Sequence, residues 1–317
     1  MLCSSASVSV PPLSILFLFL IFPFFLLQVQ ATVPPSKTFK YVNQGEFGQE
    51  LRLGGPTKVV SRVSSVDGSQ GPYSLVLEQN RVALYLKSNN SPKPLLYYYD
   101  ELGSGQDPLA YVKFNSEPET EEAYAFDLEF DYAMINSSSV SRRIWARPKY
   151  NATYSMLRVE SDGNLKIYTY SDKVDWGAWE VTFTLFDRDG SMSECKLPTR
   201  CGSLGVCEDD QCVACPTPLG LTWWSKNCAP PALPPCKSRA NVTNYYKIVG
   251  VEHFLNEYTE GDGPMKLAEC RDKCNKDCGC LGFFYREESS KCLMAPELGT
   301  LTKVSNTSHI AFIKLSK

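Results

Sequence analysis

The sequence has little of the chemistry on which most enzymes depend. Only two of its 317 residues are histidines, His253 and His309, and neither has metal-ligand spacing around it. It contains no G-x-S-x-G nucleophile motif and no P-loop. Carboxylates are plentiful, which leaves a glycosidase open, but acidic pairs such as Glu121-Glu122 are more simply a solvated face. We therefore expect no enzyme activity and no cofactor.

The sequence also lacks a cluster of basic residues. The net charge is −3 and the isoelectric point is about 5.6. No basic segment resembles those that hold a phosphate backbone, so we expect no nucleic-acid partner.

Long apolar runs are absent after the first thirty residues. Leu13 to Val29 is nearly all apolar and is followed by Val29-Gln30-Ala31, a small-x-small pattern that a signal peptidase could cut. An uncleaved anchor is the alternative, but about 17 apolar residues interrupted by Pro23 are short for a membrane span. We expect residues 1–31 to be a signal peptide, a secreted protein in the extracellular space or cell wall, and no membrane span.

Cysteine is missing from residues 4–194 and then becomes frequent. There are 13 cysteines, and Cys3 lies in the predicted signal peptide, which leaves twelve. An even number in an exported chain predicts disulfides, in any of 15 pairings for each group of six. The single Cys212-x-x-Cys215 makes zinc binding a weaker alternative, and we expect no metal. The first six are Cys195, Cys201, Cys207, Cys212, Cys215 and Cys228, and the second six are Cys236, Cys270, Cys274, Cys278, Cys280 and Cys292.

Glycosylation signals agree with export. N-x-S/T sequons place acceptor sites at Asn136, Asn151, Asn241 and Asn306, and a proline after its serine makes Asn89 a poorer fifth.

The cysteine-free part predicts β-structure. Tyr73–Glu78 and Val82–Leu86 flank a polar turn, and Ser155–Glu160 and Leu165–Tyr170 flank an Asp-Gly turn, so each pair predicts a hairpin. The two hairpins resemble a diverged internal repeat. Residues 50–72 show little pattern, and the polar residues 101–122 are expected to join two β-modules.

The last third predicts one helix and a small sheet. A helix over Pro264–Asn275 would place Leu267, Cys270 and Cys274 on one face. Strands are expected at 281–285, 292–294 and 309–313, with disulfides joining the helix to the sheet.

Two cysteine patterns resemble known plant proteins. The first six cysteines resemble the EGF-like segment of S-locus glycoproteins. The run Glu269–Cys280, closed by Cys292, resembles their PAN/apple domain. Residues 31–48 and 174–186 resemble the EP1-like secreted glycoproteins, which are bulb-type, mannose-binding-lectin-like proteins without a kinase.

This resemblance implies a mainly β fold of bulb-lectin-like β-prism modules, then an EGF-like module and a small α+β PAN/apple domain. The expected divisions are a shortened lectin-like segment at 32–114 and a second lectin-like module at 115–192. An EGF-like module follows at 193–229, and the PAN/apple domain at 236–317.

The resemblance also implies a sugar site. Bulb lectins hold mannose with Q-x-D-x-N-x-V-x-Y on one strand, where alternate side chains face the same way. The matching positions here are Glu160, Asp162, Asn164, Lys166 and Tyr168, with Glu160 in place of the amide and Lys166 in place of the valine. The simpler alternative is that 162–164 form only a turn and Tyr168 is a strand aromatic.

Two functions follow as hypotheses. The first is a secreted glycoprotein that binds mannose-type glycans or cell-wall polysaccharide. The second is a protein-interaction glycoprotein that forms a homodimer or contacts a receptor through its PAN and EGF-like modules.

Overall fold

A computed structural model describes residues 38–42, 50–55, 57–102, 107–118, 126–146, 154–171, 178–190, 192–234, 243–259 and 261–316. Strands dominate these residues, which confirms the mainly β fold class. No described helix has the length and apolar character that crossing a bilayer requires. The predicted signal peptide lies outside the described residues.

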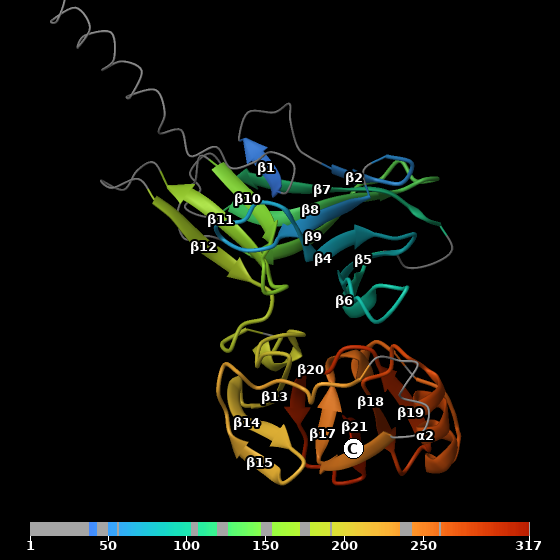
Figure 1. Cartoon of the computed structure of the whole chain (residues 1–317). Helices are drawn as coiled ribbons and strands as arrows, with labels where there is room; N and C mark the ends of the chain where they lie inside the picture. Colours follow the sequence, from blue (N-terminus) through green and yellow to red (C-terminus); the bar gives the residue numbers. More distant parts are fainter. Residues whose placement is uncertain are drawn as a thin grey trace, which may run out of the picture. The chain divides into compact units, whose positions relative to one another are not determined.

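Twelve strands form three four-stranded antiparallel sheets (Figure 1). Sheet A has the order β1 (Thr38–Val42), β10 (Tyr154–Val159), β11 (Leu165–Ser171), β12 (Ala178–Thr184). Sheet B has the order β2 (Glu50–Arg52), β7 (Leu109–Pro118), β8 (Phe126–Met134), β9 (Ser141–Ala146). Sheet C has the order β3 (Lys58–Arg62), β4 (Gln70–Leu77), β5 (Arg81–Leu86), β6 (Leu95–Glu101). Both predicted hairpins are present, as β4–β5 and β10–β11.

The three sheets correct the expected organisation of the first half. The region without pattern, 50–72, contains β2 and β3, and the expected joint, 101–122, contains the ten-residue strand β7. The boundary expected between residues 114 and 115 falls inside β7, and β1 pairs with β10 from the other side of it. Segments 32–114 and 115–192 therefore share sheets A and B. The sequence did not reveal this, because short outer strands carry too few residues to show alternation.

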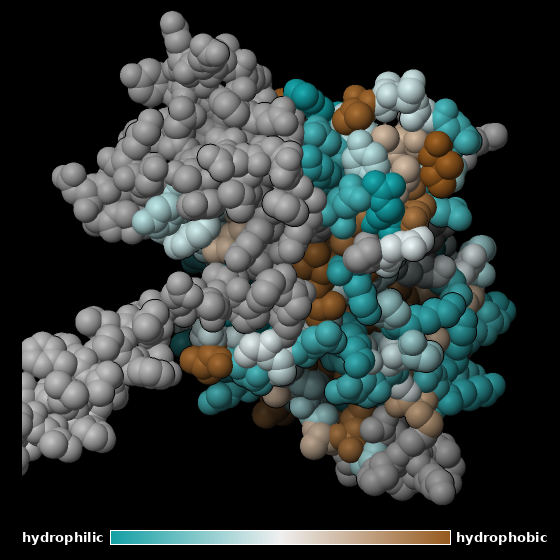
Figure 2. Space-filling view, turned by 90° about the horizontal axis from the view of Figure 1, so that it is seen from above, coloured by the Kyte–Doolittle hydropathy of each residue, from teal (hydrophilic) through white to brown (hydrophobic). Residues whose placement is uncertain are grey.

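Alternate side chains of each hairpin enter a common core. Leu165, Ile167 and Thr169 of β11 are buried, whereas the intervening Lys166 and Tyr168 are partly exposed. Between sheets B and A, the Trp145 ring packs edge-on against Phe130 and Phe183, with centroids 5.3 and 5.4 Å away. On the face seen in Figure 2, hydrophilic residues are spread over the described surface and hydrophobic ones form separate patches.

The two cysteine-rich segments share one five-stranded sheet. Its order is β15 (Gly220–Trp223), β14 (Gln211–Thr217), β13 (Leu204–Glu208), β20 (Gly299–Lys303), β17 (Val251–His253). Strands β13 and β20 are parallel, so the segments predicted as EGF-like and PAN/apple are joined by backbone hydrogen bonds. Gly299 allows this approach, because a Cβ there would lie 2.2 Å from the Pro198 carbonyl oxygen.

The last part of the chain contains a second sheet and helix α2 (Leu267–Lys276). The sheet order is β16 (Thr243–Val249), β21 (His309–Ser316), β18 (Gly282–Arg286), β19 (Lys291–Ala295), which confirms the strands predicted there. Figure 1 shows α2 beside β18 and β19. The helix begins later than the predicted Pro264, because the Met265 amide donates to Ser290 and holds the preceding chain out of the helix.

Disulfides stay within each cysteine group among the described residues. The first group pairs Cys195–Cys207, Cys201–Cys212 and Cys215–Cys228, so the two cysteines of the CxxC belong to different bridges. In the second group Cys270–Cys292 fixes α2 to β19, and Cys274–Cys280 closes the helix end. Cys278 is also disulfide-bonded, and Cys236 lies outside the described residues.

The buried His253 links β17 to the segment before β20. Its Nε2 lies 2.8 Å from the Glu297 carbonyl oxygen, and its Nδ1 accepts a hydrogen bond from the Leu255 amide at 3.2 Å. Burial lowers the pKa of His253 to about 4, and the backbone hydrogen bond to Glu297 only partly opposes this effect. The neutral ring is therefore the form that the fold requires.

We expect the free energy of unfolding to fall as pH drops from about 6.5 toward 4, because the unfolded chain then binds a proton that folded His253 excludes. The loss from this group would be roughly 3 kcal/mol at most, from 1.36 kcal/mol per pKa unit. Urea unfolding across this pH range measures it. His253→Asn should show a shallower slope, and a slope equal to that of the wild type would contradict the assignment.

Candidate functional site

The strand predicted to bind sugar lies at the β10–β11 hairpin. Its turn closes with a hydrogen bond from the Glu160 amide to the Asn164 carbonyl at 2.8 Å. Gly163 has φ +90°, and a Cβ there would lie 2.8 Å from the Tyr73 ring. The Tyr97 hydroxyl donates to the Gly163 carbonyl at 2.7 Å, so the turn packs closely against sheet C.

Asn164, which the resemblance places in the sugar site, lies in the core. Its side chain is buried: Nδ2 donates to the Phe186 carbonyl at 2.8 Å, and Oδ1 accepts from the Phe186 amide at 3.1 Å. Strand β11 begins only at Leu165, so the strand alternation behind the prediction does not apply at Asn164. Both the nitrogen and the oxygen of the Asn164 side chain are therefore engaged in hydrogen bonds within the protein.

Glu160 and Tyr168 do lie together, on the outer face of sheet A. The Tyr168 hydroxyl donates to Glu160 Oε1 at 2.8 Å, and the Arg158 guanidinium lies 3.7 Å from the same oxygen. Burial and the hydrogen bond to Glu160 raise the pKa of Tyr168 to about 12, so it stays a neutral donor. Asp162 is exposed in the turn, where its carboxylate accepts the Asn164 amide at 2.9 Å.

Sheet C carries the same three residue types, but its arginine lies on the second strand of the hairpin instead of the first. The Tyr85 hydroxyl donates to Glu78, and Arg81 lies 2.5 Å from the same carboxylate. The pairing of β5 with β6 shifts register just before Tyr85, and the pairing of β11 with β12 shifts just before Tyr168. The structure therefore supports the internal repeat that the two sequence hairpins indicate.

A larger hollow lies on the outer face of sheet C, and sequence reasoning missed it. It encloses about 780 Å³. We call it the sheet C groove; strands β3, β4 and β5 form its floor, and the loop between β5 and β6 forms one wall. Its lining residues are Lys58, Val60, Gln70, Gly71, Pro72, Tyr73, Ser74, Val76, Glu78, Tyr85, Lys87, Ser88, Ser91, Pro92, Lys93 and Pro94. Only the run Ser91–Pro94 could have drawn attention to it, because the other residues meet only in the folded sheet.

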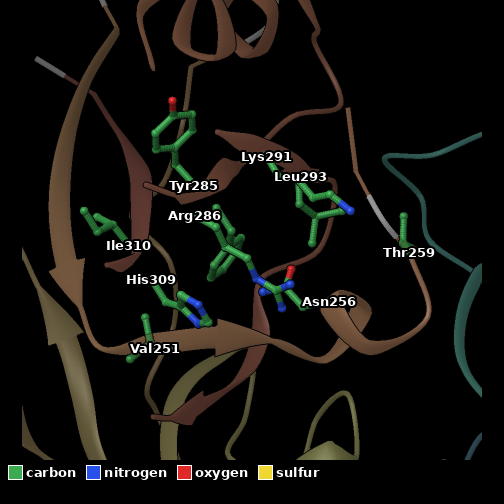
Figure 3. Close-up of a pocket in the computed structure, with 10 residues that line it drawn as sticks. Val251, Asn256, Thr259, Tyr285, Arg286, Lys291, Leu293, His309 and Ile310 are labelled. Carbon is green, nitrogen blue, oxygen red and sulfur yellow. The ribbon is translucent and has the colours of Figure 1, made fainter. Parts of the chain in front are cut away.

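A smaller pocket lies among β17, β18, β19 and β21. Figure 3 shows the side chains of Asn256, Arg286 and His309 directed toward the same space, with Tyr285 pointing away. Glu252 lies 2.7 Å from His309 Nδ1 and 2.6 Å from Arg286 Nη2. On the other side of the ring, Glu288 lies 2.8 Å from His309 Nε2. Glu252 thus lies between Arg286 and His309, and the close contacts among these side chains are simplest to read as structural.

Two of the four predicted glycosylation sites lie among the described residues. Asn136 and Asn306 are exposed in turns, and Asn136 Nδ2 donates to Asp107 at 3.1 Å. Asn151 and Asn241 lie outside the described residues. Exposure of the two described residues is compatible with glycan attachment, which stays a prediction.

The strand-rich fold with its two disulfide-bonded segments fits a lectin-like fold. No family model matches the chain. EP1-like glycoprotein 4 of Arabidopsis thaliana is 39% identical over 272 residues, which cover 84% of this chain and 60% of that protein. The epidermis-specific secreted glycoprotein EP1 of Daucus carota is 45% identical over 210 residues, covering 60% of this chain and 53% of it. The chain is thus a relative of the EP1-like glycoproteins, as its sequence predicted.

More distant matches agree with the lectin-like and PAN resemblances. A G-type lectin S-receptor-like serine/threonine-protein kinase of Arabidopsis thaliana is 24% identical, covering 85% of this chain and 30% of the kinase. A PAN domain-containing protein of the same plant is 27% identical over half of this chain and 31% of that protein. This chain spans about 60% of the length of the EP1-like relatives it matches. The secreted relative and the disulfides support the predicted extracellular location.

The two site residues of the β10–β11 turn should differ sharply in their effect on stability. Asn164→Ala leaves the Phe186 amide and carbonyl without partners, so we expect a loss of about 2–4 kcal/mol in the free energy of unfolding. Asp162→Asn keeps a side-chain acceptor in an exposed turn and should change it by less than about 1 kcal/mol. Urea denaturation of the oxidised protein compares them, and equal small losses would show that Asn164 is free to serve a ligand.

Proposed function

We propose that this protein is a non-enzymatic, secreted, lectin-like glycoprotein that binds carbohydrate on the outer face of sheet C. The observation that carries this proposal is the sheet C groove. It combines apolar surface from Val60, Val76 and Pro92 with hydroxyl groups from Ser74 and Ser91. Sugars need both, because their C–H faces pack on apolar groups while their hydroxyls exchange hydrogen bonds.

The predicted site on sheet A is the weaker candidate within the same proposal. The Asn164 side chain is hydrogen-bonded to the backbone of Phe186, and Tyr168 is hydrogen-bonded to Glu160. A sugar would have to break these hydrogen bonds before forming its own, which lowers affinity. Mannose binding there would therefore rest on Asp162 alone.

Further parts of the proposal concern the N-terminal leader and the two cysteine-rich segments. We propose that residues 1–31 are removed as a signal peptide and that the protein associates with the cell wall. We further propose that residues 193–229 and 236–317 are EGF-like and PAN/apple modules.

Filling the groove tests the main site. Ser74 lines it, so Ser74→Trp should block it, whereas Val181→Trp puts the same side chain on the exposed outer face of sheet A. We expect retention on an array of mannose and cell-wall oligosaccharides to fall at least about tenfold for Ser74→Trp, or about 1.4 kcal/mol. Val181→Trp should bind like the wild type.

The opposite pattern would place binding on sheet A, and Asp162→Ala should then remove the mannose signal. A folded, oxidised wild-type protein retained by no sugar, with or without free mannose as competitor, would overturn the carbohydrate proposal.

A second candidate function is self-association, and one surface favours it. Leu219, Leu221 and Trp223 are 100%, 57% and 93% exposed on or next to β15, which is the last strand of its sheet. Leu221 and Trp223 lie two positions apart and so face the same side. An edge strand with exposed apolar side chains can pair with the same strand of a second copy about a twofold axis. This surface lies in the segment 193–229 and not in the predicted PAN domain.

If self-association occurs there, Trp223→Ser together with Leu221→Ser should convert a dimer to a monomer. Analytical ultracentrifugation over a range of protein concentrations measures this. Exposed residues contribute little to the fold, so the variant should unfold like the wild type. A wild-type monomer at all concentrations, or a dimer unaffected by both changes, would exclude this surface.

A further inference from the structure

Three lysines around the sheet C groove have no acidic partner. Lys58 is on β3, Lys87 follows β5, and Lys93 is in the loop before β6, and all three are exposed. Among the described residues no carboxylate lies within 4 Å of their ammonium groups. Some lysines elsewhere are paired: Lys196 lies 2.7 Å from Glu257, and Lys303 lies 2.7 Å from Glu208.

The one acidic residue that lines the groove does not offset these charges. Glu78 accepts the Tyr85 hydroxyl and lies 2.5 Å from Arg81, which neutralises it. The groove therefore carries excess positive charge on a chain whose net charge is −3. Such a contrast attracts anions to one place on an otherwise acidic protein.

The loop that carries two of the lysines is held in place. Ser88 Oγ donates to Glu297 at 2.6 Å, and the Asn90 side chain donates to the Pro296 carbonyl at 3.0 Å. The Lys87 amide also donates to the Pro72 carbonyl at 2.8 Å, which ties the start of the loop to β4. A fixed loop loses less conformational entropy when it binds a ligand, so these charges are positioned in advance.

We infer that the sheet C groove binds an acidic oligosaccharide, one whose sugar rings carry anionic groups. The inference rests on the proposed carbohydrate binding and names its ligand class. The lysines would pair with the anionic groups, while Val60, Val76 and the prolines contact the apolar faces of the rings. Lysine presents a point charge without the bidentate geometry of arginine, so carboxylate and sulfate groups both fit this chemistry.

Charge can be tested separately from sugar shape. The probe is an oligomer of galacturonic acid, compared with its fully methyl-esterified form, which keeps the backbone and removes the charge. We expect the acid form to bind at least about tenfold more tightly at low salt, and the difference to shrink as salt screens the lysines. Isothermal titration calorimetry at two salt concentrations measures both. A sulfated galactose oligomer, run in parallel, distinguishes which anionic group is preferred.

A matched pair of triple variants locates the charge. Lys58→Gln, Lys87→Gln and Lys93→Gln together should remove the preference for the acid form. Lys226→Gln, Lys247→Gln and Lys276→Gln change the net charge equally at exposed positions outside the groove and should leave the preference intact.

The failures are distinguishable. Equal binding of the acid and ester forms, both lost in Ser74→Trp, would leave carbohydrate binding in place and overturn the acidic ligand. Equal loss in the two triple variants would show general attraction to positive charge and overturn it too. Binding of no oligosaccharide would overturn this inference together with the proposed function.

Discussion

The hydrogen bonds between the side-chain amide of Asn164 and the backbone of Phe186 help to hold sheets A and C together. They fix the β10–β11 turn to the segment that follows β12, and Phe186 in turn contacts the rings of Tyr97 and Tyr98, with centroids 6.1 and 5.9 Å away. The Tyr97 hydroxyl also donates a hydrogen bond to the Gly163 carbonyl in the same turn. Sheets A and C are thereby joined at one buried point, where an unpaired polar group would be costly.

This constraint explains why the two repeated hairpins differ in what they can do. On sheet A the outer polar groups pair with one another, and the residue that would complete a sugar site has turned into the core. On sheet C the same tyrosine–glutamate–arginine set occurs, but the β5–β6 loop adds a wall and brings lysines beside it. A repeat conserves the backbone pattern more strictly than the function of each copy, because strand pairing tolerates changes on the solvent side that ligand binding does not.

The sequence was informative wherever a pattern was local. Turn chemistry at Asp162-Gly163 predicted the β10–β11 hairpin, and the spacing of Cys270 and Cys274 predicted the buried face of α2. It failed for β2, β3 and β7, because these strands are short or polar on one face and acquire their partners from distant segments. The structure brings Glu160 and Tyr168 together and buries Asn164, whereas a role of any of them in sugar binding stays a prediction. The sheet C groove could not be foreseen, since its walls come from four separate stretches.

Residues 229–235, Ala-Pro-Pro-Ala-Leu-Pro-Pro, connect the two cysteine-rich segments, and the parallel pairing of β13 with β20 makes that connection less important. Because backbone hydrogen bonds and the bridge between Lys303 and Glu208 join the two cysteine-rich segments directly, the covalent connection is not what keeps them adjacent. A protease that cut this segment would leave two disulfide-bonded pieces associated through a completed sheet. A protein exposed to extracellular proteases could thus be nicked there and still keep its fold.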